Sequence, residues 1–241
     1  MAAGGRGETT RDGLAGPAAP PSDREPVVMV TGTFRALGRH RFLRGDTAWM
    51  ADIEKVPTGG LGEMVFTGPP YSVAYEGKTA KKLTIGNDAL GEKFYDFLRE
   101  PSANMPAVTK GAIYMCMSSS EWHTLFRASS DAGGHWPTFV IGAKHHFTLG
   151  RSDYQRMNGS ILYGWRDGTQ HFWCGDRNQG DVWFIKRPMA NLEHPTMKPV
   201  ELVERAFRNS RQDFRHDPRS IRWVRNDIDS VRARQPPGAR D

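Results

Sequence analysis

Residues 63–79 read EMVFTGPPYSVAYEGKT, in which a short apolar stretch runs into Gly68-Pro69-Pro70-Tyr71. The apolar stretch is typical of a buried strand, and prolines end a strand because proline has a fixed φ and no N–H to donate. A tyrosine on such a stiff turn can stack flat against a nucleobase, which contributes about 1–3 kcal/mol per base. Taken alone, the four residues favour an ordinary proline-rich turn between a strand and a helix.

The chain around this stretch alternates between strand and helix patterns, which predicts an α/β fold with crossover helices. Helices are expected after Asn87-Asp88, near Ser120 and after Pro199. The apolar residues expected to share one face of each helix are Phe94, Phe97 and Leu98 in the first, Trp122, Leu125 and Phe126 in the second, and Val200, Val203 and Phe207 in the third. The polar segment Phe147–Gly180, rich in aromatic residues and arginine, is expected to be a loop-and-hairpin insertion on one edge of the sheet. The expected strands are Val27–Val30, Arg41–Arg44, Met64–Thr67, Ala112–Cys116, Thr138–Ile141, Ile161–Tyr163 and Val182–Phe184.

Composition limits the class of protein. Residues 1–26 are rich in Gly, Ala, Pro and charge, which predicts disorder; acidic residues and prolines argue against a transit peptide. No apolar run is long enough to span a bilayer. The two cysteines, Cys116 and Cys174, are too few for a disulfide framework or a zinc site, which fits a reducing cytoplasm. The net charge of +6 permits a polyanionic partner such as DNA.

Five further segments follow Gly68-Pro69-Pro70-Tyr71 in a fixed order: YEGKT, LGRSDY, ILYGW, GDRNQGDVW and HPTMKPVELVERAFRNS. This co-linear set resembles the amino-methylating DNA methyltransferases of the β motif order, over roughly His40–Ser210. The resemblance implies an incomplete Rossmann-like sheet within residues 27–210. It also implies site-specific methyl transfer from S-adenosylmethionine to adenine N6 in double-stranded DNA, with cytosine N4 as the less favoured acceptor.

In that family the target base is flipped out of the duplex, because its amine cannot be reached inside the stack. The resemblance implies that the Pro69 carbonyl accepts a hydrogen bond from the amine, that Pro70 stiffens the turn and that Tyr71 stacks on the base. Gly68 stands where the family usually has the catalytic Asp. Because a hydrogen bond to a charged group is worth about 1.5–3 kcal/mol, its loss implies a roughly 10–150-fold slower reaction.

The resemblance also implies residues for the cofactor and for DNA. Asp46 and the loop residues His194, Thr196 and Lys198 match cofactor-side positions, although Asp46 equally fits a turn that ends a strand, and Lys198 could be a phosphate contact or a surface charge. Within Phe147–Gly180, which would read the target sequence, the candidate DNA contacts are Arg151, Ser152, Tyr154 and Arg177. No metal site is expected, because His145 and His146 on a strand would face opposite ways.

Other positions depart from the family pattern. Gly142 and Ala143 lie where the family commonly has Trp, and Arg156–Ser160 replaces a segment that commonly reads Trp-His-Glu-Pro. A buried packing residue replaced by Gly or Arg costs several kcal/mol; tolerated variation in a divergent branch is the alternative interpretation.

The family's glycine-rich cofactor loop is missing from its expected place after the Pro199 helix. Residues 211–241 hold eight Arg and five Asp instead, and one glycine near the end. Codons can be chosen for Pro218–Arg232 that, one base over, read Leu-Asp-Pro-Phe-Gly-Gly-Ser-Gly-Thr-Thr-Leu-Thr-Ala-Cys. A frameshift between Asn209 and Pro218 is therefore compatible with the protein sequence, and an arginine-rich DNA-binding tail is the rival interpretation.

Together these features predict a degraded, inactive copy of a DNA methyltransferase that has lost S-adenosylmethionine binding. The alternatives are a catalytically dead DNA-binding module, perhaps beside an intact methyltransferase subunit or as a dimer, and a remnant that is not translated or is rapidly degraded. Because two central strands would be missing from the sheet, unpaired edges and an unfilled core predict low stability or aggregation.

Overall fold

The structure is a computed structural model and describes residues 32–37, 40–57, 60–74, 84–85, 88–147, 149, 153–186, 198–211 and 231–232. The predicted strand Val27–Val30, the N-terminal segment 1–26 and most of the tail lie outside these residues. The elements are β1 (Phe34–Leu37), β2 (His40–Leu43), α1 (Met50–Ile53), β3 (Val65–Thr67), β4 (Thr84–Ile85), the 3-10 turn η1 (Gly91–Lys93), α2 (Phe94–Val108), β5 (Ile113–Met117), α3 (Trp122–Asp131), β6 (Gly134–Ala143), β7 (Asn158–Arg166), β8 (Val182–Phe184), α4 (Val200–Ser210) and β9 (Val231–Arg232).

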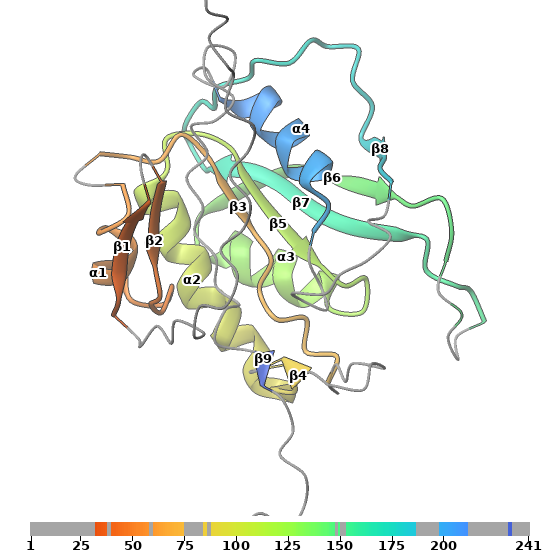
Figure 1. Cartoon of the computed structure of the whole chain (residues 1–241), viewed down its shortest axis with the longest axis horizontal. Helices are drawn as coiled ribbons and strands as arrows, with labels where there is room; N and C mark the ends of the chain where they lie inside the picture. Colours follow the sequence, from red (N-terminus) through yellow and green to blue (C-terminus); the bar gives the residue numbers. More distant parts are fainter. Residues whose placement is uncertain are drawn as a thin grey trace, which may run out of the picture.

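A five-stranded mixed sheet in the order β3-β5-β7-β6-β8 forms the centre of the molecule (Figure 1). β3 and β5 are parallel and are joined through α2, as expected for a crossover connection. β7 lies antiparallel between β5 and β6, and β8 continues the sheet parallel to β6. The predicted α/β class is confirmed, with a sheet of mixed strand direction.

The two faces of the sheet carry different helices. On one face Ile161 and Tyr163 of β7 pack with Leu202 and Ala206 of α4, and Figure 1 shows α4 crossing this face. On the other face Leu162 packs against residues of α2 and α3. This division follows from strand geometry, since successive side chains of a strand point to opposite faces. β1 and β2 form a separate antiparallel hairpin.

The predicted elements that fall on described residues are confirmed, with different ends. β6 is much longer than the predicted Thr138–Ile141, whereas β8 matches Val182–Phe184. Two residues assigned to buried helix faces are exposed: Phe126 at 45% and Val200 at 63%. The sequence patterns missed β1, the one-turn helix α1 and the two-residue pair β4–β9.

The predicted position of segment 147–180 at one edge of the sheet is wrong for its central part. Residues 158–166 form β7, which pairs with β5 on one side and β6 on the other. The segment looked like an insertion because polar residues surround a strand core of only a few apolar residues. A role of its exposed ends in DNA recognition stays a prediction.

Gly142, where the resemblance led us to expect a lost packing residue, lies buried on β6. A Cβ atom at this position would lie 3.0 Å from Leu202 Cδ1 and 3.5 Å from the Gly159 carbonyl oxygen. The Leu202 side chain of α4 therefore already packs closely against the glycine, and a larger residue here would have to displace it.

The hydroxyl of Tyr114 gives a measurable test of how α4 is held on the sheet. It forms a buried 2.8 Å hydrogen bond with Ser210 Oγ, at the end of α4. Burial raises the pKa of Tyr114, so this hydroxyl stays neutral. We expect Tyr114→Phe to lower the free energy of unfolding by about 1–3 kcal/mol, because Ser210 is left buried without this partner. The measurement is the urea midpoint followed by tryptophan fluorescence.

Tyr163→Phe is the matched control, because Tyr163 lies on the same face and no hydrogen bond of its hydroxyl is seen among the described residues. The double variant Tyr114→Phe/Ser210→Ala should lose less stability than the sum of the single variants. Equal effects of Tyr114→Phe and Tyr163→Phe would contradict a role of this hydrogen bond.

Candidate functional site

The loop Gly68–Ala74 leaves the C-terminal end of β3 and is held by one buried carboxylate. Asp88 Oδ1 accepts hydrogen bonds from the backbone N–H groups of Tyr71 at 2.8 Å and Val73 at 3.3 Å. The Asp88 carbonyl oxygen also accepts a 2.6 Å hydrogen bond from the N–H of Ala74. Asp88 is only 3% exposed, so a buried charge is satisfied by the loop that it holds.

This loop has an uncommon backbone. Ser72 and Ala74 have φ values of 52° and 49°, a left-handed region that side-chain-bearing residues rarely adopt. Such conformations cost on the order of 1–3 kcal/mol each and persist only where surrounding contacts impose them. Here the two positions lie directly beside the N–H groups that Asp88 binds. The loop is therefore fixed by Asp88 together with the buried rings of Pro69 and Pro70.

The Tyr71 ring is partly buried and packs against the cores on both sides of the sheet. Lys198, which lies just before α4, places its Nζ atom 4.7 Å from the centre of this ring. That distance is within the range of a cation–π interaction. The cation and the aromatic face thus come together from positions far apart in the sequence, and a cofactor role for Lys198 stays a prediction.

Gly68 has room for a side chain. A Cβ atom at this position would lie 3.5 Å from Lys198 Cε, 3.7 Å from Cys116 Cβ and 3.9 Å from Lys198 Nζ, all ordinary contact distances. The glycine is therefore not required by steric crowding, and an aspartate here would bring its carboxylate within ion-pair reach of Lys198. Burial raises the pKa of the Cys116 thiol to about 11, although Lys198 opposes the shift, so Cys116 is a neutral thiol at pH 7.

Asp46 lies in a turn that follows β2, which agrees with the interpretation of this residue as part of a turn that ends a strand. Its Oδ1 accepts a 2.9 Å hydrogen bond from the N–H of Ala48, and its own N–H donates to Asp52 Oδ2 at 3.2 Å. Asn104 of α2 anchors the same turn by donating to the carbonyl oxygens of Thr47 and Ala48, at 2.9 and 2.7 Å. A cofactor role for Asp46 stays a prediction.

Arg156 belongs to the same end of the sheet, although the sequence marked it only as a departure from the family. Its Nη1 donates a 2.9 Å hydrogen bond to Ser118 Oγ, directly after β5. Because β3 and β5 are parallel, their C-terminal ends lie at one edge of the sheet. Both Arg156 and Lys198 therefore bring positive charge to the side on which the Gly68–Ala74 loop emerges.

The remaining predicted site residues either have no seen contact with the Gly68–Ala74 loop or lie outside the described residues. Tyr154 is 91% exposed and Arg177 is also exposed, and no contact seen among the described residues joins either to Gly68 or Tyr71. Arg151, Ser152, His194 and Thr196 lie outside the described residues. No group of His, Cys, Asp or Glu able to hold a metal ion occurs in the part of the chain that the structure describes.

Sequence reasoning missed the role of Asp88, which it read only as the start of a helix. The one available signal was a lone Asp between a loop and an apolar helix. That signal does not reveal a partner 17 residues earlier. Such a bond depends on how the chain returns past the end of β3, which no local pattern encodes.

Comparisons with known proteins give a fold likeness only. No protein-family model matches the chain, and no curated protein sequence matches it. The structure is similar to that of an M1.HpyAVI–SAM complex, with a TM-score of 0.46 and 16% identity over 67% of this chain and 72% of the other. A second structure, of M1.HpyAVI, gives a TM-score of 0.44 and 12% identity over 69% and 73% of the two chains.

The described residues at the end of β3 do not fit S-adenosylmethionine. In the described part of the chain no strand pairs with the outer edge of β3. The cation Lys198 lies next to Gly68, whereas the carboxylate of Asp88 is already used by loop N–H groups. A cationic sulfonium ligand would meet a like charge here.

Substitution of Asp88 tests what holds the loop. We expect Asp88→Ala to speed hydrogen exchange of the backbone amides in the 68–74 region by at least about tenfold, because two N–H groups lose their charged acceptor. Asp96→Ala is the control, since Asp96 is an exposed carboxylate on α2. If both variants left exchange in this loop unchanged, another contact would have to fix it.

Proposed function

We propose that this chain is a degraded DNA methyltransferase of the amino-methylating, β-order type, which no longer catalyses methyl transfer. The observation that carries this proposal is a rigid Pro-Pro-Tyr loop that lacks the carboxylate expected at its first position. Pro69, Pro70 and Tyr71 form a rigid loop held by Asp88, whereas position 68 has no carboxylate and lies beside Lys198. The motif order in the sequence supplies the ancestry, with adenine N6 favoured as the ancestral acceptor.

The residues present can perform part of the reaction. The Pro69 carbonyl oxygen can accept one hydrogen bond from an exocyclic amine, and the Tyr71 ring can stack on a flipped base once Lys198 moves off it. The Lys198 ammonium group can only donate hydrogen bonds, so it cannot replace an Asp that accepts one from the amine. Without that acceptor the amine lone pair stays conjugated with the base and is a poor nucleophile.

A methyl-transfer assay with radiolabelled S-adenosylmethionine and mixed-sequence DNA tests this proposal. The chain as it stands should transfer no methyl groups above background. A chain expressed with the reading frame repaired between Asn209 and Pro218, and which also carries Gly68→Asp, should gain activity. The same repaired chain with Gly68 should be roughly 10–150-fold slower, from one lost hydrogen bond to a charged acceptor.

The controls separate the two defects. Gly68→Asp alone should stay inactive, because the cofactor loop is still missing. Transfer by the unaltered chain at a rate that Gly68→Asp does not change would overturn the proposal. The coding DNA offers an independent check: codons for Pro218–Arg232 that give no Gly-Gly-x-Gly run one base over would remove the frameshift explanation.

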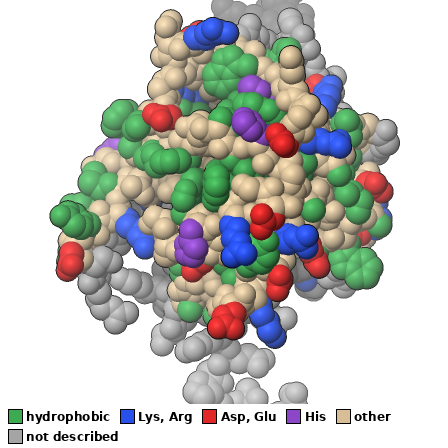
Figure 2. All heavy atoms as spheres, turned by 180° about the vertical axis from the view of Figure 1, so that it is seen from behind, with side chains coloured by type: hydrophobic (Ala, Val, Ile, Leu, Met, Phe, Trp, Pro, Cys, Tyr) green, Lys and Arg blue, Asp and Glu red, His purple; other side chains and the backbone are tan. Residues whose placement is uncertain are grey.

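A DNA-binding function without catalysis is the second candidate. It is favoured by exposed aromatic and basic side chains in the described part of segment 147–180, among them Tyr154, Phe172 and Arg177. Figure 2 shows Lys and Arg side chains interspersed with Asp and Glu on the face it presents. This mixture argues against a broad basic surface for DNA on that face. On this face, binding would therefore depend on a few local contacts rather than on a continuous basic surface.

Fluorescence anisotropy with a labelled duplex and a single strand tests this second function. We expect affinity to fall steeply between 50 and 200 mM salt, and Tyr154→Ala to weaken single-strand binding by roughly 5–100-fold through lost stacking. Phe184→Ala is the control, because Phe184 is a similarly exposed aromatic residue, at 78%, on the edge strand β8. Equal losses in the two variants would argue against a specific Tyr154 contact.

A further inference from the structure

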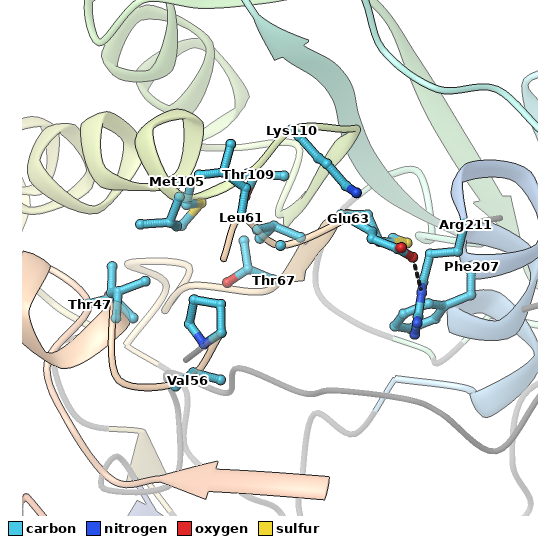
Figure 3. A pocket seen from close by; sticks show the side chains of 16 residues that line it. Thr47, Val56, Leu61, Glu63, Thr67, Met105, Thr109, Lys110, Phe207 and Arg211 are labelled. Carbon is cyan, nitrogen blue, oxygen red and sulfur yellow. Dashed lines mark hydrogen bonds and ion pairs between the residues drawn. The ribbon is translucent and has the colours of Figure 1, made fainter. Parts of the chain in front are cut away.

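The outer edge of β3 is bordered by a cavity of about 200 Å³ that the function proposed above does not use. The cavity lies between α1 and α4, which form its two sides in Figure 3. Val56 lines it on the α1 side and Phe207 on the α4 side, and Met105 and Val108 of α2 line its floor. We call this space the β3 groove.

Val65 and Thr67 of β3 line this groove, and the backbone of Phe66 between them has no strand partner on the outer edge among the described residues. The N–H of Val65 donates to the Ala112 carbonyl oxygen at 2.9 Å, on the β5 side. Since neighbouring residues in a strand direct their N–H and C=O groups to opposite edges, those of Phe66 face the other way. In the part of the chain that the structure describes, β3 pairs with β5 alone.

A polar group at the floor of the groove is also unsatisfied. Thr109 is 5% exposed and lines the groove, and its Oγ1 atom is buried without a hydrogen-bond partner among the described residues. An apolar wall, an open strand edge and a buried hydroxyl together describe a place suited to another extended backbone rather than to a rigid apolar molecule.

The charge at one end of the groove indicates the chemistry of the occupant. Glu63 and Arg211 form a 2.8 Å ion pair there, with Arg211 only 9% exposed. Lys110 lines the same end, is exposed and has no ion pair among the described residues, and Figure 3 shows its side chain extending toward this pair. These three residues together carry one net positive charge, which favours an acidic side chain on the partner.

We propose that the β3 groove binds an extended segment of another polypeptide as an added strand. The segment carries apolar side chains at alternate positions and an acidic side chain at the end that meets Lys110. Its backbone pairs with Phe66 at the usual strand spacing of about 4.8 Å. Alternate side chains then point toward Phe207 on one face of the sheet and toward Met105 and Val108 on the other.

Synthetic peptides test the proposal with the full-length chain. The probes are fluorescein-labelled Glu-Val-Ser-Val-Ser-Val and the reversed Val-Ser-Val-Ser-Val-Glu, since a parallel strand puts the acid at its start and an antiparallel strand at its end. Fluorescence polarisation should show saturable binding of one probe. Lys110→Glu should weaken that binding roughly three- to tenfold, whereas Lys93→Glu, which reverses an exposed charge away from the groove, should not.

N-methylated probes separate strand pairing from apolar binding without altering the protein. Methyl groups on the amides of one peptide edge should weaken binding at least about tenfold, and methyl groups on the alternate amides should leave it nearly unchanged. Equal affinity of the two methylated forms would overturn strand addition. So would failure of both probes to bind while sedimentation shows a dimer, because the groove would then hold a second copy of the chain.

Discussion

The parallel pairing of β3 with β5 is the constraint on which the rest of the described structure depends. α2 carries the chain from one strand to the other, and the pairing fixes Val65 against Ile113 and Thr67 against Met115. The C-terminal end of β3 then has to leave the sheet through two prolines, which aim the loop at Asp88 and Lys198. Its outer edge, in turn, faces the space between α1 and α4. The loop and the groove are thus two consequences of one edge strand.

The positive charge of Lys198 beside position 68 limits the chemistry that the Gly68–Ala74 loop can perform. The family resemblance places an acceptor at position 68, and the backbone leaves room for one, yet the side chain that approaches this position is an ammonium group. Lys198 stabilises the Tyr71 ring through a cation–π contact and at the same time lies over a surface on which a base would stack. A single interaction therefore contributes to the stability of the loop and opposes both parts of the reaction that the resemblance implies, ring stacking and activation of the amine.

Much of this arrangement could be predicted from the sequence, because it follows from local patterns. The apolar stripe of α4 and the short strands β3, β5 and β8 were readable from periodicity, and the proline pair marked the end of β3. The strand β7 was predicted only in its apolar centre, since its outer residues gain their strand conformation by pairing with β5 and β6. The positions of Asp88 and Arg156 could not be predicted, because each acts through a partner distant in sequence. Phe126 was misassigned because helical spacing identifies a stripe but not the width of the surface that covers it.

If the tail is out of frame, as proposed above, the contacts at the end of α4 limit where the shift can lie. Asn209 exchanges two side-chain hydrogen bonds with Gln179, both 2.9 Å, and its carbonyl oxygen accepts a 2.7 Å bond from the N–H of Cys174. Ser210 bonds Tyr114 in the core, and Arg211 pairs with Glu63 while its N–H closes the helix onto the Phe207 carbonyl oxygen. Three successive buried residues with mutually specific partners are expected of a sequence selected to pack and are improbable for out-of-frame codons. The contacts therefore place Arg211 with the folded domain rather than with the tail. A frameshift, on this argument, falls after Arg211, in a narrower interval than the sequence alone allowed.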